Sequence, residues 1–215
     1  MNEENFKVKI SDIYFDHSNS YFLLLNDYML RSRTKNNSTK WELKYPSKLS
    51  DLNKNVENYY ELTDSKEIIN AIFNLSNRYP IYSSHLKHKN RCDTIDSLIH
   101  LFDLKPYARI NSLRKSYLFE ENIRIDLDET DFNYRLGEIE LILDEKTKKS
   151  TKTIDESIQK ISNLTSTLGI TNFDKIPGKI SAYLYLFNPT LFELLIKNAT
   201  IDEKVVLNLN HLFKK

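Results

Sequence analysis

Charged and apolar residues alternate one by one in two short segments of this chain, and this alternation constrains the fold more than any other feature. Residues 124–128 read Arg-Ile-Asp-Leu-Asp, and residues 137–140 read Gly-Glu-Ile-Glu. On a β-strand, positions two apart lie on the same face. The charged residues of each segment therefore share one face of a strand, with the apolar residues behind them. Parallel carboxylates at this spacing offer the oxygen ligands that a hard divalent cation requires.

The same alternation recurs in the first third of the chain, with bases as well as acids. Residues 30–33 (Leu-Arg-Ser-Arg) place two guanidinium groups on one strand face, residues 41–44 (Trp-Glu-Leu-Lys) place an acid beside a base, and residues 59–62 (Tyr-Tyr-Glu-Leu) add another acid. One such strand is most simply a solvated face over an apolar core. Several strands that enclose both signs of charge are too costly unless the charges are paired or bind a ligand and a metal. A polyphosphate is the kind of ligand that needs several cations and a metal.

Composition allows one ordinary folded domain, which we take to span residues 1–215. The chain is 40% hydrophobic and 28% charged, and its formal net charge of +1 lacks the basic excess typical of nucleic-acid binders. A single cysteine, Cys92, excludes an internal disulfide and favours a reducing compartment. No run approaches the ~18 apolar residues of a membrane span, and residues 1–9 carry charges where a signal peptide needs an apolar core. We therefore expect a monomeric cytoplasmic protein without a membrane or nucleic-acid partner.

The predicted elements are strands, two helices, further strands and a helical C-terminal third. Asn36 and Asn37 predict a hairpin turn, Asp64 followed by Glu67 predicts a helix start, and Gly169 predicts a helix end. The strands are predicted at residues 6–16, 28–34, 40–45, 57–63, 107–119, 122–128, 131–136 and 137–143. The helices are predicted at residues 64–78, 93–102, 153–168, 178–187 and 190–197.

Five motifs, in order, resemble the thiamine triphosphatases of the CYTH, or triphosphate tunnel metalloenzyme, superfamily. They are Trp-Glu-Leu-Lys at 41–44, Tyr-x-Glu-Leu-Thr at 59–63, Arg-x-Asp-Leu-Asp-x-x-Asp-Phe-x-Tyr at 124–134, Gly-Glu-Ile-Glu at 137–140 and Lys-Ile-x-x-Tyr-Leu-x-x-Phe at 179–187. The resemblance runs over about residues 6–196. It implies an α+β fold in which an eight-stranded antiparallel β-barrel, with helices outside, holds triphosphate and Mg²⁺ in its tunnel.

The resemblance also implies roles for individual residues. The substrate-binding residues it implies are Arg31, Arg33, Lys44, Lys115 and Lys179, with Arg114 as the alternative to Lys115 after a one-residue shift. The metal ligands it implies are Glu61, Asp126, Glu138 and Glu140. Lys44 and Tyr14 match a catalytic pair, in which the lysine acts as general base on water and the tyrosine orients it. The bases would position the phosphates, and the carboxylates would hold Mg²⁺ against phosphate oxygens.

The activity that the resemblance implies is Mg²⁺-dependent hydrolysis of thiamine triphosphate to thiamine diphosphate and phosphate. Met29 stands where the family has a tryptophan that contacts thiamine, which keeps inorganic tripolyphosphate open as the substrate. The family's N-terminal Glu-x-Glu-x-Lys strand is not recognisable, because residues 3–7 (Glu-Glu-Asn-Phe-Lys) have its composition but not its spacing. We therefore expect a barrel one strand short. A phosphate-binding remnant without turnover is the alternative from a different functional class.

Overall fold

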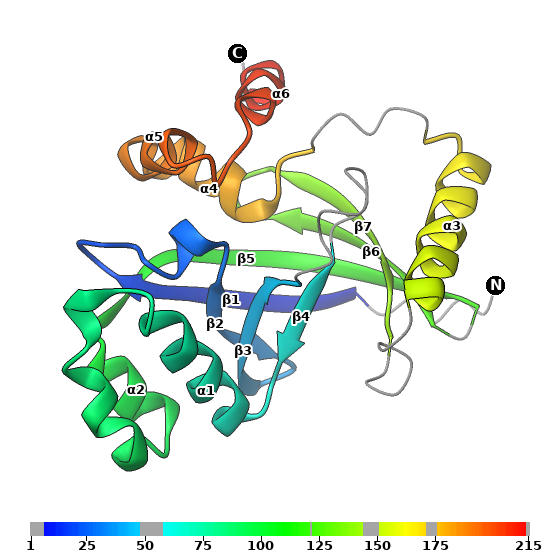
Figure 1. The fold of residues 1–215 in the computed structure, drawn as a ribbon. Helices are drawn as coiled ribbons and strands as arrows, with labels where there is room; N and C mark the ends of the chain where they lie inside the picture. Colours follow the sequence, from blue (N-terminus) through cyan, green and yellow to red (C-terminus); the bar gives the residue numbers. More distant parts are fainter. Residues whose placement is uncertain (1–6, 48–57, 121, 144–150, 171–175, 214–215) are drawn as a thin grey trace.

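A curled antiparallel sheet of seven strands forms the centre of the molecule (Figure 1). The computed structural model describes residues 7–47, 58–120, 122–143, 151–170 and 176–213. The strands are β1 (Lys7–His17), β2 (Met29–Lys35), β3 (Ser38–Pro46), β4 (Tyr59–Leu62), β5 (Leu104–Phe119), β6 (Ile123–Thr130) and β7 (Arg135–Leu141). Their order is β4-β3-β2-β1-β5-β6-β7, and every pair of neighbours is antiparallel.

This architecture confirms the predicted α+β class and the antiparallel sheet. The family's eight strands become seven within the described ranges, and β4 and β7 stand at the two ends of the strand order. Residues 3–6, which hold most of the segment compared above with the Glu-x-Glu-x-Lys strand, lie outside the described residues.

The described ranges contain six α-helices, which are arranged around the sheet (Figure 1). They are α1 (Ser65–Ser76), α2 (Ile95–Leu101), α3 (Thr151–Thr167), α4 (Lys179–Phe187), α5 (Pro189–Lys197) and α6 (Glu203–Phe213). The helices α1 and α2 lie together on one side, α4 to α6 lie on the opposite side, and α3 lies at the far end of β7. Within the described parts of the chain, no helix is both long and apolar enough to cross a bilayer.

Local sequence signals explain several of these boundaries. Asn36 and Asn37 have φ values of 51° and 61°, as a two-residue type I′ hairpin requires, and so they join β2 to β3 as predicted. Asp64 caps α1 by accepting hydrogen bonds from the backbone N–H groups of Lys66 and Glu67, at 2.9 and 3.0 Å. Gly169, with φ 72°, follows the end of α3.

Other boundaries differ from the prediction. The expected strands at 131–136 and 137–143 are one strand, β7, because residues 131–134 form the turn of a β6–β7 hairpin. Asn133 adopts φ 61° in this turn, and the Thr130 hydroxyl accepts a hydrogen bond from the Tyr134 N–H at 3.0 Å. Strand β5 begins at Leu104, ahead of the predicted start, and passes Pro106 where its pairing with β1 shifts register. Helix α6 was not predicted.

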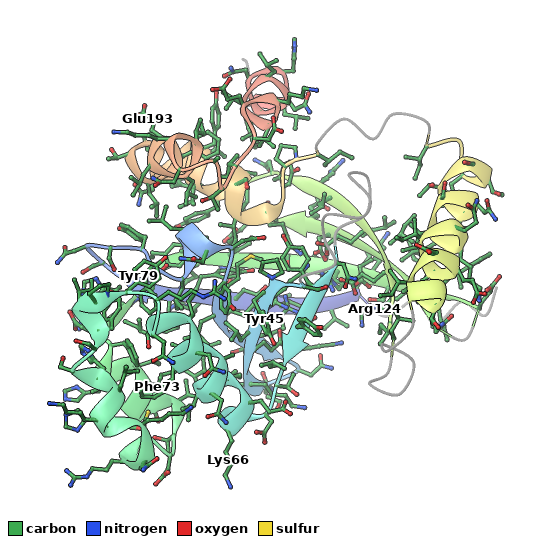
Figure 2. All side chains as sticks on the ribbon, in the orientation of Figure 1. Tyr45, Lys66, Phe73, Tyr79, Arg124 and Glu193 are labelled. Carbon is green, nitrogen blue, oxygen red and sulfur yellow. The ribbon has the colours of Figure 1, made fainter. Side chains whose placement is uncertain are left out.

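Two apolar clusters hold the helices against the sheet. The first joins Leu30 and Leu43 of the sheet to the apolar face of α1, including Ile72 and Phe73, and Figure 2 shows Tyr45 and Phe73 on this side. The second joins Ala108 to the C-terminal helices and lies across the sheet from the first. Burying large apolar side chains contributes about 1.5–3 kcal/mol each, so these clusters are the main source of stability.

Asp16 at the end of β1 anchors the segment that leads to β2. Its carboxylate accepts hydrogen bonds from the backbone N–H groups of His17, Leu24 and Leu23, at 2.8, 2.7 and 3.2 Å. The side chain is almost fully buried. Burial raises the pKa of Asp16 to about 7, from an ordinary value of 3.8, although the three backbone hydrogen bonds act in the opposite direction.

This raised pKa predicts a pH dependence of stability that Asp16→Asn should remove. Between the two pKa values the folded protein keeps the proton while the unfolded chain loses it, so the stabilisation is complete near pH 4 and is lost as the pH approaches 7. As the pH rises from 4 to 7, the free energy of unfolding of the Asn variant should therefore increase relative to that of the wild type by on the order of 3–4 kcal/mol. Urea unfolding of both proteins from pH 4 to 8 measures this difference, and a difference that does not change with pH would contradict the assignment.

Candidate active site

Acidic and basic side chains from neighbouring strands gather on one face of the curled sheet. We call this face the inner face. Cross-strand register brings Tyr14 opposite Arg31, Arg31 opposite Glu42, and Asp126 opposite Glu138. Residues paired in this way lie on the same face. The predicted alternation is therefore confirmed. The inner-face set is Asp12, Tyr14, Arg31, Arg33, Glu42, Lys44, Glu61, Arg114, Arg124, Asp126, Asp128, Glu138 and Glu140, with Lys179 from α4.

The first group of ion pairs surrounds the two arginines of β2. Arg31 lies 2.7 Å from a Glu42 oxygen and 3.0 Å from a Glu61 oxygen. Arg33 donates two hydrogen bonds to Asp12, at 2.7 and 2.8 Å, and lies 3.4 Å from Glu42. Strands β1, β3 and β4 thus each contribute a carboxylate that pairs with an arginine of β2. The two guanidinium groups share Glu42 as a partner.

The second group surrounds Arg114 on β5. Arg114 donates two hydrogen bonds to Asp128 at 2.7 and 2.6 Å, another to Asp126, and one to Glu138 at 3.0 Å. Lys179, at the start of α4, pairs with Asp128 and lies 3.4 Å from Glu138. Helix α4 therefore delivers a cation to the carboxylates of β6 and β7. Both aspartate side chains are fully buried.

The curl of the sheet brings these two groups within electrostatic reach of each other. Burial raises the pKa of Glu138, but the charges of Lys179 and Arg114, and to a smaller extent Lys44 on β3, outweigh burial and lower it. Burial likewise acts against the ionised form of Asp12, whose pKa is nevertheless lowered by Arg33, by Arg31 and by Lys179. Lys44 on β3 therefore acts on a carboxylate of β7, and Lys179 on α4 acts on a carboxylate of β1, as a shared site requires.

Tyr14 and Lys44 both belong to the inner face, but each contacts a different residue. The Tyr14 hydroxyl lies 3.5 Å from an Arg31 nitrogen, and burial raises its pKa, so it remains a phenol at neutral pH. The Lys44 ammonium lies 4.5 Å from the centre of the Tyr59 ring and stands in register with Glu61. The structure brings the predicted catalytic pair to one face, with Tyr14 beside Arg31 and Lys44 beside the Tyr59 ring.

Lys115 lies on the opposite face from the one that its predicted role requires. It stands in register with Lys7 and Leu127, on the side away from Arg114. Side chains alternate along a strand, so a shift of one residue reverses the face. The structure therefore corrects the prediction in favour of its alternative, and Arg114 is the residue that joins the inner face.

The predicted metal ligands are divided between the two halves of the sheet. Asp126, Glu138 and Glu140 come from β6 and β7, whereas Glu61 lies on β4 beside Arg31. Glu140 pairs with Arg124 at 2.5 Å. Among the residues that the structure describes, no three Asp, Glu, His or Cys side chains converge on one point. Oxygen donors on neighbouring strands nevertheless suit Mg²⁺ chemically, and protein cations now hold those oxygens.

Asp12 is the inner-face residue that the sequence analysis did not single out. It lies two positions before Tyr14 on β1, so the strand period alone would have placed the two side chains on the same face. Its two hydrogen bonds to Arg33 could be seen only in the structure.

A cavity of about 630 Å³ lies beside one end of the inner face, between α3 and the ends of β5 to β7. Its walls include Leu118, Ile142 and Lys160, and it meets the inner face at Arg124. Figure 2 shows Arg124 at this end of the sheet, next to α3. The cavity is mostly apolar, in contrast to the ion pairs beside it.

The chain is similar to several known proteins. The profile of the CYTH domain matches residues 2–178. Human thiamine-triphosphatase is 26% identical over 197 residues, which cover 89% of this chain and 79% of the human protein. The thiamine-triphosphatase of Macaca fascicularis is 26% identical over 196 residues, covering 89% and 78%. The solved PH1819 protein of Pyrococcus horikoshii OT3 is 22% identical, with a TM-score of 0.47 and coverage of 79% and 80%.

The opposite positions of Arg114 and Lys115 predict opposite effects on stability. Arg114→Met should lower the free energy of unfolding by about 3 kcal/mol or more, because it leaves buried carboxylates short of a cation. Lys115→Met should change it by less than about 0.5 kcal/mol, because this side chain lies on the outer face, in register with Lys7 and Leu127. Urea unfolding of the two variants is the measurement. Equal losses would contradict the assignment of Arg114 to the inner face.

Proposed function

The chain belongs to the CYTH domain family, and from this premise we propose that it hydrolyses the terminal phosphoanhydride bond of a triphosphate on its inner face. The observation that carries the proposal is the convergence of Arg31 and Arg33 from β2 with Arg114 from β5 and Lys179 from α4. A triphosphate offers oxygens along its whole length. Cations that approach from several sides of a curled sheet suit such a ligand better than a single basic patch does.

The balance of charge on the inner face supports a metal requirement. The inner-face set defined above contains six cationic and seven carboxylate side chains. When arginines turn toward phosphate oxygens, the buried carboxylates lose their partners and repel the polyanion. A divalent cation would relieve both effects. We therefore propose Mg²⁺ as the cofactor, held by Asp126, Glu138 and Glu140.

Glu61 has the weakest support among the proposed metal ligands. Its side chain is 44% exposed and contacts Arg31, across the sheet from Asp126. We keep it as a proposed ligand on the basis of the family motif alone. When bound, the metal would polarise phosphate oxygens and neutralise charge on the leaving group.

The proposed reaction uses water as the nucleophile. Water attacks the terminal phosphorus, the bond from that phosphorus to the bridging oxygen breaks, and the bridging oxygen leaves on the diphosphate. In this proposal Lys44 acts in its neutral amine form, which accepts the proton of the attacking water and so becomes an ammonium, and Tyr14 orients the water through its hydroxyl. The arginines stabilise the charge that moves onto the phosphate oxygens. Arg31, which lies 3.5 Å from the Tyr14 hydroxyl, would link phosphate binding to this step.

Thiamine triphosphate is the substrate that we propose, with inorganic tripolyphosphate as the alternative. The similarity to two thiamine-triphosphatases supports the first. Met29 stands in register with Lys44 and packs, partly buried, against the second apolar cluster, so it offers an apolar contact near the phosphates. Tripolyphosphate would need no such contact. A monomeric state and a cytoplasmic location stay predictions.

Phosphate release with and without Mg²⁺ tests the proposal directly. Thiamine triphosphate, tripolyphosphate and ATP should be offered side by side to the 215-residue protein. We expect Mg²⁺-dependent release, fastest from thiamine triphosphate. Release that is fastest from tripolyphosphate would favour the alternative substrate. A folded protein that binds tripolyphosphate but releases no phosphate would be the phosphate-binding remnant.

Glu138→Gln tests the proposed metal ligands. The substitution keeps the shape of the side chain but removes its charge, so the Mg²⁺ concentration for half-maximal activity should rise on the order of 10-fold or more. Glu129→Gln is the matched control, because Glu129 lies on neighbouring β6 and pairs with Arg135 in an exposed position. An unchanged Mg²⁺ titration in the Glu138 variant would remove that residue from the metal site.

A further inference from the structure

We propose that Asp12 is a positioning residue, which fixes the guanidinium group of Arg33 for contact with the triphosphate. This inference rests on the proposed function, since it assigns a role within the same site. Asp12 belongs to neither the predicted phosphate-binding residues nor the predicted metal ligands. It acts through Arg33 and need not touch the substrate.

The hydrogen bonds between the two residues fix the guanidinium in both direction and rotation. One carboxylate oxygen accepts from Nε of Arg33 at 2.7 Å, and the other accepts from Nη2 at 2.8 Å. Two parallel bonds between planar groups fix their common plane. A guanidinium has five N–H donors, so three remain after Asp12 has taken two. The other terminal nitrogen, Nη1, lies 3.4 Å from Glu42, which shows that this end faces the rest of the inner face.

The position of Asp12 in the sheet makes it a rigid support. Strand β1 has neighbours on both sides, and Asp12 stands in register with Arg33 on β2 and with Ile110 on β5. Its side chain is 3% exposed, whereas that of Glu61, which holds Arg31, is 44% exposed. A binding group supported by a buried residue on a central strand keeps its geometry better than one supported from an edge.

The charges around Asp12 keep it ionised. Burial opposes its negative charge, but the hydrogen bonds from Arg33 and the charges of Arg31, Arg33 and Lys179 lower its pKa below the ordinary 3.8. The pair with Arg33 therefore persists throughout the neutral range. It is lost only when the pH falls through the lowered pKa. Positioning by Asp12 is thus a fixed property of the site at working pH.

An ordinary structural ion pair is the competing explanation, and activity distinguishes the two. A structural pair would contribute to stability without affecting what Arg33 does to the substrate. A positioning pair couples the two residues in catalysis, because the effect of Asp12 passes through Arg33. The chain offers a matched control in Glu129 and Arg135, an exposed pair with distances of 3.2 and 2.8 Å.

The test is a double-mutant cycle of Asp12→Asn, Arg33→Ala and the combined variant, with Glu129→Gln as control. Phosphate release gives kcat and KM, calorimetry gives tripolyphosphate binding, and thermal unfolding confirms that each protein is folded. We expect Asp12→Asn to lower kcat on the order of 10- to 100-fold with a smaller change in KM. The combined variant should be no slower than Arg33→Ala alone, and Glu129→Gln should match the wild type.

Independent losses that multiply in the combined variant would overturn the proposal, as would a folded Asp12→Asn protein with normal kcat. If Asp12→Asn does not fold, the combined variant removes both charges of the pair and is compared with Arg33→Ala; a further loss of kcat in the combined variant then counts against positioning. A wild type without turnover would refute the proposed function separately. In that case the same double-mutant cycle is measured as tripolyphosphate affinity, and losses of affinity that multiply in the combined variant would overturn the positioning role. A wild type that does not bind tripolyphosphate would overturn both the positioning role and the proposed function.

Discussion

The pairing of buried opposite charges across neighbouring strands is the interaction on which the rest of this structure depends. Each ion taken from water into a folded interior costs several kcal/mol, and the attraction between partners repays that cost only when the hydrogen bonds are well placed. Arg114 meets this condition by donating to Asp126, Asp128 and Glu138. The ion-pair network therefore compensates its own cost of burial. The free energy that stabilises the fold comes from the apolar clusters on the two sides of the sheet.

Strand periodicity made much of the inner face predictable from the sequence. Positions two apart share a face, so the alternation around Asp126 and Glu138 placed the acids correctly, and the Asn36–Asn37 turn placed the β2–β3 hairpin. The same periodicity explains the error at Lys115. A basic pair such as Arg114–Lys115 offers one residue to each face, and only the register with β6 decides which one lies inside.

Other features depended on contacts that the sequence does not encode locally. Residues 131–134 have strand-like composition, but the Thr130 hydroxyl and the left-handed Asn133 make them a turn. Helix α6 packs its buried Val205 and Leu209 into the second apolar cluster, whose other members include residues of the sheet and of α4 and α5. The approach of Lys179 to Asp128 joins residues far apart in the chain, so only the three-dimensional arrangement shows it.

The central pairing of β1 with β5 has a consequence for how the molecule forms. It joins residues 7–17 to residues 104–115, so its formation requires the long intervening segment to close into a loop. Sheets built on such distant pairings fold more slowly than those built from hairpins alone. On one side of this pairing, β2 carries Arg31 and Arg33. On the other side, β5 carries Arg114. Hairpins can form within each half of the chain from local pairing, but the charged site is complete only when β1 pairs with β5 and brings the two halves together.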